Sequence, residues 1–181
     1  SGALGDNVFG SGTTIHLVLH RGAGAYICGE ETAMMNSLEG KRGNPRIKPP
    51  FPAVSGVFAQ PTTINNVETL TAVPHILVNG ADWYKKYSRK DNPKSTGTKL
   101  YSVCGNIQKP GNYEVAMGFP FKDFLYDLCG GPLSGRKFKA IIPGGISVPI
   151  HTLAEAEATL MDYEGFVANG TMLGSGGVII V

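Results

Sequence analysis

A glycine-rich stretch between an apolar run and a helical pattern places the strongest constraint on the fold of this chain. Residues 15–19 are apolar except for His16, as in a strand buried on both faces of a parallel sheet. The next residues, 21–29, read RGAGAYICG, and the apolar spacing beyond them predicts a helix that begins near Glu30 and stops at Gly40. Because ligands of open α/β sheets bind beyond the strand ends, this stretch predicts a ligand site.

A long loop and a second helix follow within the predicted α/β domain, which spans residues 1–90. Residues 41–61 are rich in proline and glycine and predict an extended loop, a kind of segment that is more often functional than idle. Asn65 precedes Glu68 by three positions, a variant of the capping box that opens a helix. The apolar residues at helical spacing are expected to form its buried face: Val67, Leu70, Val73 and Leu77.

The hydrophobic period changes in the second half of the chain, residues 97–181. A polar stretch, 91–96, is expected to link the two halves. Apolar residues at helical spacing predict a helix over 121–128, and proline and glycine within 109–112 predict a type II turn. Four short segments are predicted strands: 99–103, 113–115, 139–142 and 177–181. Hairpin, helix and strand in this order predict an α+β module of the β-grasp (ubiquitin-like) type.

The composition argues against several classes of protein. The chain has 16 Lys and Arg against 14 Asp and Glu, a net charge of +2, which argues against a nucleic-acid binder that neutralises phosphates. Its longest apolar runs have the length of strands, so no membrane insertion is expected, and its first residues carry no leader for export. The three cysteines, Cys28, Cys104 and Cys129, form no metal-binding pattern and fit a reducing, cytoplasmic setting.

Two neighbouring carboxylates, Glu30 and Glu31, give the glycine-rich stretch a specific chemistry. The stretch departs from the dinucleotide fingerprint because Ile27 occupies the third glycine position. Two carboxylates at a helix start oppose a phosphate, but they suit hydrogen bonds from ribose hydroxyls or from a carboxamide. The alternative is that both residues only favour the helix N-terminus through its dipole.

Two further clusters are candidate binding segments. The loop 41–52 carries several cations that can hold a diphosphate and an aromatic residue that can stack on a ring, the alternative being a solvated basic loop. In the segment 63–69, side-chain amides and hydroxyls lie beside a predicted helix start and can bind a phosphate or the edge of a flavin. The alternative is that Asn65 only caps the helix. The sequence contains no hydrolase or nucleotide-triphosphatase motif.

Three segments, taken together and in this order, resemble the signature stretches of the NADH-binding flavoprotein subunits of respiratory complex I: 21–32, 45–52 and 60–69. The resemblance continues through three shorter segments: 97–100, 143–145 and 172–176. Diaphorase subunits of NAD-reducing hydrogenases and of NAD-dependent formate dehydrogenases are similar and remain the alternative. The resemblance implies the C-terminal part of a Rossmann-like FMN and NADH domain, followed by a soluble-ligand-binding β-grasp domain.

The resemblance also implies the cofactors, FMN and NAD(H), and the reaction. In that family FMN accepts a hydride from NADH and passes electrons singly to an iron–sulfur cluster, on the way to quinone. Because the cofactor carries this chemistry, no catalytic side chain is expected. The implied binding residues are Tyr26, Gly29, Glu30 and Glu31 for FMN and nicotinamide, Lys48 and Phe51 for NADH, and Ile64, Asn65, Asn66 and Thr69 for FMN.

Further expectations follow from the resemblance. A glycine-rich FMN loop and a four-cysteine domain for a 4Fe-4S cluster are expected outside these residues, so no metal is ligated here and these residues alone are not expected to oxidise NADH. The implied partners are neighbouring iron–sulfur subunits, in a complex whose peripheral part lies on the cytoplasmic or matrix side of the inner membrane. An alternative hypothesis, from a different class of function, is that the chain is a non-catalytic docking fragment whose β-grasp half holds neighbouring subunits.

Overall fold

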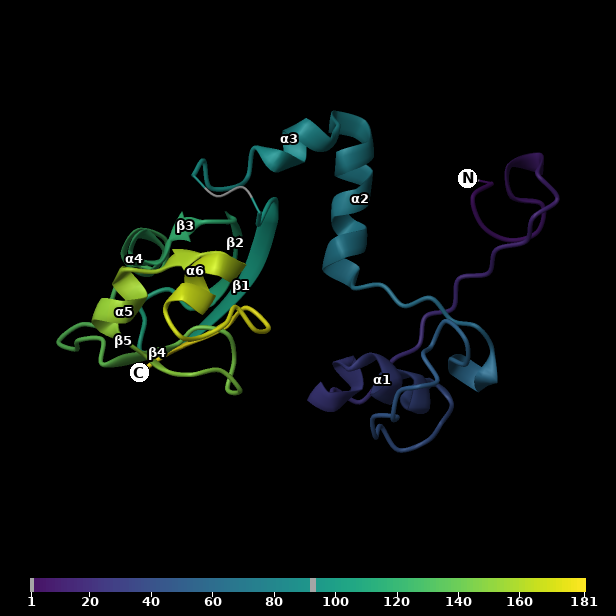
Figure 1. Cartoon of the computed structure of the whole chain (residues 1–181), viewed down its shortest axis with the longest axis horizontal. Coiled ribbons are helices and arrows are strands. Elements are labelled where there is room, and N and C mark those ends of the chain that lie inside the picture. Colours follow the sequence, from purple (N-terminus) through teal and green to yellow (C-terminus); the bar gives the residue numbers. More distant parts are fainter. Residues whose placement is uncertain (1, 92–93) are drawn as a thin grey trace. The chain divides into compact units, whose positions relative to one another are not determined.

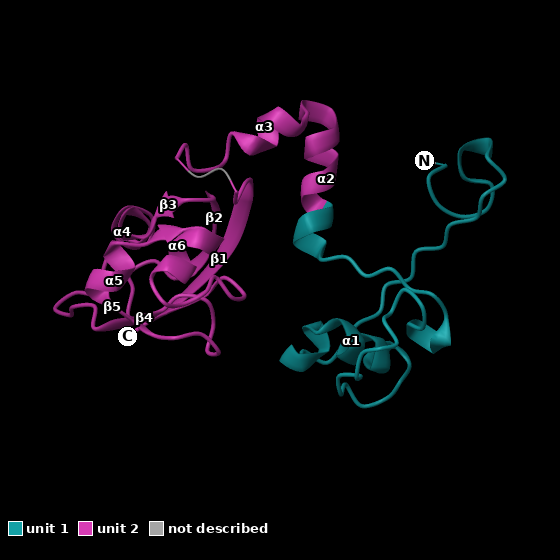
Figure 2. Ribbon diagram, viewed as in Figure 1, with its two compact units in different colours: residues 1–70 teal, residues 71–181 magenta. Residues whose placement is uncertain are grey.

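The computed structural model describes residues 2–91 and 94–181, which form two compact units, 1–70 and 71–181 (Figure 2). Helices and short strands occur together, so the chain is a mixed α/β protein (Figure 1). None of the helices in the described residues is long and apolar enough to cross a membrane.

The described part of unit 1 contains the helix α1, the first turn of α2 and several short 3₁₀ turns. The helices and turns that begin in this unit are η1 (Val8–Gly10), η2 (Tyr26–Gly29), α1 (Glu31–Leu38), η3 (Val57–Ala59) and α2 (Val67–Asn79). The predicted helix between Glu30 and Gly40 is confirmed as α1, because Glu30 caps its start and Gly40 follows its end with a φ of 74°.

The strand predicted over 15–19 is wrong. Ile15 makes an isolated bridge with Gly5, and Leu17, Val18 and Leu19 are 79%, 84% and 87% exposed. A parallel strand needs hydrogen-bonded neighbours, and no strand among the described residues pairs with this segment. The described part of unit 1 therefore contains no sheet, and its Rossmann-like fold stays a prediction.

The second predicted helix forms as α2, but its predicted buried face is wrong. No residue of α2 is buried, and Val67, Leu70, Val73 and Leu77 are all exposed. Helical spacing of apolar residues specifies a helix, whereas burial also requires another element to cover the apolar stripe.

Unit 2 is built on a five-stranded mixed sheet in the order β2-β1-β7-β4-β5. The central pair, β1 and β7, is parallel, while β1 with β2 and β4 with both β7 and β5 are antiparallel. The strands are β1 (Thr98–Gly105), β2 (Gly111–Ala116), β4 (Ala140–Ile142), β5 (His151–Thr152) and β7 (Gly177–Ile180). The four predicted strands are thus confirmed as β1, β2, β4 and β7.

Helices and a second, two-stranded sheet complete unit 2 (Figure 1). These elements are α3 (Ala81–Lys85), β3 (Phe119–Pro120), α4 (Phe121–Asp123), the π-helical turn η4 (Phe124–Leu128), α5 (Leu153–Glu157), β6 (Leu160–Met161) and α6 (Tyr163–Ala168). The helix predicted over 121–128 is confirmed as α4 followed by η4. The elements α3, β3, β5, β6, α5 and α6 were not predicted.

The predicted linker, 91–96, includes residues 92 and 93, which lie outside the described residues. Described residues before and after these two positions bond to α6 and to its N-cap. Arg89 Nη1 lies 3.5 Å from Oδ2 of the buried Asp162, and the hydroxyl of the buried Ser95 donates to Glu164 at 2.6 Å. The polar composition of this stretch therefore reflects ion pairs and hydrogen bonds as well as exposure to solvent.

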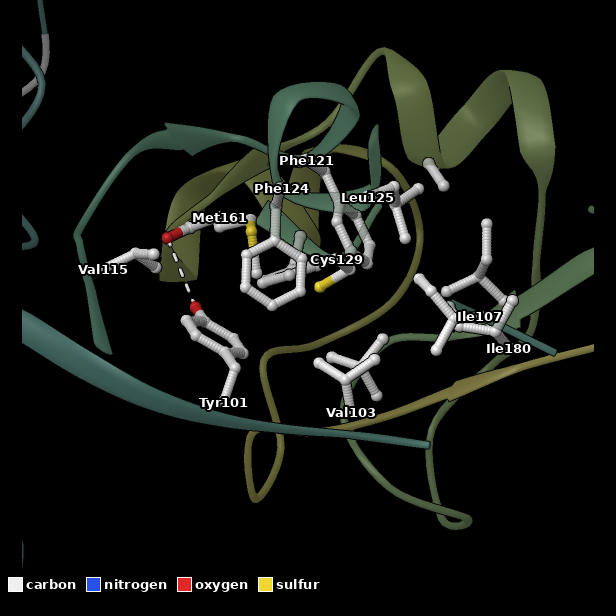
Figure 3. Packing of buried hydrophobic residues seen from close by; sticks show 14 of the residues in the cluster. Tyr101, Val103, Ile107, Val115, Phe121, Phe124, Leu125, Cys129, Met161 and Ile180 are labelled. Carbon is white, nitrogen blue, oxygen red and sulfur yellow. Dashed lines mark hydrogen bonds between the residues drawn. The ribbon is translucent and has the colours of Figure 1, made fainter. Parts of the chain in front are cut away.

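The hydrophobic core of unit 2 lies between the five-stranded sheet and the helices (Figure 3). Tyr101 and Val103 are buried on β1 while their neighbours Ser102 and Cys104 are exposed, which is the two-residue period of a strand with one covered face. Aromatic rings from α4 and η4 face them, and the centroids of Tyr101 and Phe124 lie 5.8 Å apart with an edge-on angle of 61°. The Tyr101 hydroxyl also donates to the carbonyl of Met161 at 3.3 Å.

Replacing Phe124 by alanine is expected to destabilise unit 2 by about 3–5 kcal/mol, because the fully buried ring contacts two further aromatic rings and would leave a cavity. Urea unfolding followed by circular dichroism measures the change. The matched control is Lys122→Ala on the exposed side of α4, which should stay within about 0.5 kcal/mol. Equal effects of the two substitutions would contradict this position of the core.

Candidate functional site

The N-terminus of α1 is capped by a candidate site residue, Glu30. Its Oε2 accepts hydrogen bonds from the backbone N–H of Thr32 at 2.9 Å and of Ala33 at 2.8 Å, and from the Thr32 hydroxyl at 2.6 Å. The Thr32 hydroxyl, followed by the Ala33 amide, holds the pKa of Glu30 below its ordinary value. Glu30 is therefore ionised at neutral pH, and it occupies the N–H groups that a helix start would otherwise offer to a phosphate.

Lys48 joins Glu30 and Glu31 in one charged cluster, here called the carboxylate–lysine trio. Lys48 Nζ donates to Glu31 Oε1 and lies 3.9 Å from Glu30 Oε1. The hydrogen bond to Glu31 is the main reason that the pKa of Lys48 is raised above its ordinary value. The Lys48 and Glu31 side chains are 33% and 38% exposed, so a ligand can reach the trio.

A hollow of about 350 Å³ adjoins this cluster and is lined by Tyr26, Ile27, Gly29 and Glu30. Tyr26 is 83% exposed, so its ring is available to a ligand. No atom lies within 4 Å of the position that a Cβ on Gly29 would take, which leaves open space beside the backbone. An exposed aromatic ring, an open glycine and a carboxylate can accommodate a flat, polar ring system.

The structure brings together only some of the predicted binding residues. Glu30, Glu31 and Lys48 are in contact, and Tyr26 and Gly29 share the hollow with Glu30. The lining of that hollow does not include the remaining candidates among the described residues, which are Phe51, Ile64, Asn65, Asn66 and Thr69. Phe51 lies in the long loop and is exposed.

The N-cap of α2 is Asn66 and not Asn65. Asn66 Oδ1 accepts from the backbone N–H of Glu68 at 2.8 Å and of Thr69 at 3.2 Å. A capping side chain bonds the second or third N–H of its helix, and because α2 begins at Val67, position 66 has this geometry. Ordinary helix capping, which was the alternative explanation for the segment 63–69, therefore does occur, but at Asn66 and not at Asn65.

The long loop is fastened to α1 by residues that the sequence analysis missed, Glu39 and Arg46. Glu39 Oε1 accepts from Arg46 Nη2 at 2.7 Å and from the backbone N–H of Phe58 at 2.8 Å, and Glu39 Oε2 accepts from Lys41 Nζ at 2.5 Å. Lys41, Arg46 and the Phe58 amide, in this order, lower the pKa of Glu39 to about 2. An acidic residue at a helix C-terminus opposes the dipole, and this signal could have indicated a cationic partner.

A glycine also lets the loop approach the site. A Cβ added at Gly43 would collide with Cys28 Sγ, so the loop backbone packs directly on η2 at this point. Cys28 is a free thiol, as are Cys104 and Cys129. Within the described residues, no group of three or more His, Cys, Asp or Glu side chains is placed to hold a metal ion.

Comparison with known proteins identifies the relatives of this chain. Residues 4–75 match the family model of the Nuo51 FMN-binding domain. The chain is 51% identical over 181 residues to the F 2 subunit of NADH-quinone oxidoreductase in Rhizobium meliloti (strain 1021), a match that covers 100% of this chain and 42% of that protein. Over its whole length the chain is similar in sequence to F subunits of NADH-quinone oxidoreductases. The resemblance stated from the sequence is thereby confirmed.

Other relatives agree. The NADH-quinone oxidoreductase F subunit of Rickettsia bellii (strain OSU 85-389) is 49% identical over 181 residues, covering 99% of this chain and 43% of that protein. A solved NAD+-reducing [NiFe]-hydrogenase in the air-oxidized state matches with a TM-score of 0.75 and 37% identity, covering 93% of this chain and 27% of that chain. The chain thus spans about two fifths of the length of the curated relatives that it matches.

The Glu39 carboxyl is expected to titrate near pH 2 in the folded chain, which ¹³C NMR of labelled glutamate measures. Because this pKa lies below the ordinary value of 4.5, the stabilisation from Glu39 is complete above about pH 4.5 and is lost as the pH falls toward 2. Arg46→Gln should raise the titration midpoint, whereas Arg136→Gln, which removes a partner of Asn106, should leave it unchanged. A midpoint near 4.5 in the unaltered chain would contradict the role of Arg46.

Proposed function

We propose that this chain forms part of an NADH dehydrogenase that takes a hydride from NADH onto FMN and passes electrons to iron–sulfur clusters and on to quinone. The observation that carries the proposal is the carboxylate–lysine trio, which lies beside a hollow within the residues that match the FMN-binding family model. The homology to NADH-quinone oxidoreductase subunits supports the same reaction.

The residues at the hollow fit the two implied cofactors. The exposed Tyr26 ring and the open side of Gly29 suit the flat ring of a flavin or of a nicotinamide. When bound, FMN supplies the redox chemistry, since a flavin can take two electrons together and release them singly. Ile64, Asn65, Asn66 and Thr69 are proposed to contact FMN from their own segment.

The carboxylate–lysine trio is proposed to bind the ribose and amide groups of NADH. Glu30 and Glu31 accept hydrogen bonds from hydroxyls or from the carboxamide, and Lys48 donates one. Two carboxylates and one ammonium leave a net negative charge, which repels the additional 2′-phosphate of NADPH. Phe51, exposed three residues after Lys48, is proposed to stack on the nucleotide.

The proposed domain arrangement is a partial Rossmann-like FMN and NADH domain over 1–90 and a β-grasp domain over 97–181. The β-grasp assignment is supported by the sheet order β2-β1-β7-β4-β5, by the parallel pair β1 and β7, and by the helix that follows the first hairpin. The glycine-rich FMN loop and the 4Fe-4S domain are proposed to belong to other parts of the whole protein. Neighbouring iron–sulfur subunits are the proposed partners, on the cytoplasmic or matrix side of the membrane.

A second candidate function is that of a diaphorase subunit in an NAD-reducing hydrogenase. It is favoured by the structural match to such an enzyme at a TM-score of 0.75. The lower identity of that match, 37% against 51% for the quinone-linked relative, is the reason for preferring the first candidate.

Anaerobic titration of the full-length holoprotein with NADH and with NADPH tests the proposal. Bleaching of the flavin absorbance by NADH and not by NADPH is the expected result. A flavin that neither nucleotide reduces would overturn it and would leave subunit docking as the better account of this chain.

Glu31→Gln is expected to raise the Kd for NADH about tenfold or more, because a charged hydrogen-bond acceptor is lost while the size of the side chain is kept. Fluorescence quenching by NADH measures the affinity, and circular dichroism checks the fold. The matched control is Asp127→Asn, which removes one negative charge from an exposed position of unit 2 and should leave the Kd unchanged. An unchanged Kd for Glu31→Gln would count against the assigned role.

A further inference from the structure

We propose that Thr32, Glu39 and Arg46 are positioning residues, which fasten the loop 41–60 to α1 and thereby hold Lys48 against Glu30 and Glu31. The inference rests on the proposed function of the carboxylate–lysine trio in binding NADH. It assigns a role in nucleotide binding to three side chains that lie outside the trio.

The first attachment is a single hydroxyl that links the helix cap to the loop. The Thr32 hydroxyl donates to Glu30 Oε2 at 2.6 Å and accepts from the backbone N–H of Arg46 at 2.7 Å. Thr32 is 1% exposed, so water does not replace these partners. Because Arg46 precedes Lys48 by two residues and Lys48 Nζ faces Glu30 Oε1 at 3.9 Å, the contacts close a ring from Glu30 through Thr32 and the loop back to Glu30.

The second attachment is the guanidinium of Arg46, which holds both ends of the loop. Its Nη2 donates to Glu39 Oε1 at 2.7 Å, its Nε to Asn36 Oδ1 at 2.8 Å and its Nη1 to the carbonyl of Gly56 at 3.1 Å. The same oxygen of Glu39 accepts from the Phe58 amide at 2.8 Å. The planar guanidinium presents its donors in a fixed fork, so these partners set its orientation.

Between these attachments lie residues 47–55, which carry Lys48 and Phe51. The Lys48 and Glu31 side chains are about one third exposed, and an ion pair of this kind is too weak to fix a flexible lysine. The attachments at Thr32 and Glu39 therefore determine where the Lys48 ammonium lies. If the loop is already ordered before NADH binds, no binding free energy is lost in ordering it. We propose that the three positioning residues strengthen NADH binding through this preorganisation.

The test uses the full-length holoprotein with FMN and the pair Thr32→Val and Thr32→Ser. Valine keeps the shape and removes the hydroxyl, whereas serine keeps the hydroxyl. Thr32→Val is expected to raise the Kd and the KM for NADH about tenfold, the effect of one lost buried hydrogen-bond partner, with kcat and the Kd for FMN unchanged. Thr32→Ser should restore both values to within about twofold.

Hydrogen exchange provides a readout that does not depend on activity. The Arg46 amide should exchange faster in Thr32→Val and not in Thr32→Ser, because only valine removes its acceptor. Glu39→Gln should speed exchange at the Phe58 amide and raise the Kd for NADH in the same way. Its matched control is Glu114→Gln, the same substitution at an exposed position of β2 in unit 2, which should change neither value.

The outcomes separate this inference from the proposed function. If Lys48→Gln weakens NADH binding while Thr32→Val and Glu39→Gln do not, the positioning role is overturned and the function stands. Equal losses of NADH and FMN affinity in Thr32→Val would show a structural residue and would also overturn it. If the unaltered protein does not bind NADH, the proposed function fails together with the role inferred from it, whatever the exchange rates are. Should Thr32→Val fail to fold, Glu39→Gln tests the same prediction.

Discussion

The attachment of a long irregular loop to one helix, through the side chain and the backbone of Arg46, is the interaction on which the candidate site depends. A proline-rich loop has few backbone hydrogen bonds of its own, so side chains from a regular element must fix it. Here α1 provides them, with Thr32 near its start and Glu39 just after its end. Lys48 consequently meets Glu31 across 17 positions of sequence.

The two units are stabilised by different physical effects. Unit 2 has a continuous core of aromatic and aliphatic side chains between a sheet and helices. In the described part of unit 1, the buried apolar side chains are Val8, Ala33, Met35 and Pro52, while other apolar side chains such as Leu17–Leu19 are exposed. Order around α1 therefore depends on hydrogen bonds and ion pairs, and single polar substitutions should disturb it more than unit 2.

The sequence predicted the elements whose signals are local. The strands of the β1–β2 hairpin and the helix α1 carry their periodicity and cap within a few residues, and they form as expected. The type II turn predicted over 109–112 is wrong, because Gly111 and Asn112 already pair with β1 as part of β2 and Gly111 has an extended φ of 158°. For α5, Thr152 and Glu155 form a complete capping box, a local signal that could have revealed this helix. The strand over 15–19 and the buried face of α2 were wrong because burial depends on partners that local patterns do not specify. The attachment of Arg46 to Glu39 joins two segments and was missed for the same reason.

The most direct test of the site is a structure of the full-length holoprotein with bound NADH. The prediction is that ribose hydroxyls or the carboxamide lie within about 3.2 Å of the Glu30 or Glu31 carboxylate, with the Lys48 ammonium also in contact. The loop 41–60 should keep its attachments to Thr32 and Glu39. A nucleotide bound elsewhere, with the carboxylate–lysine trio facing only solvent, would contradict the account.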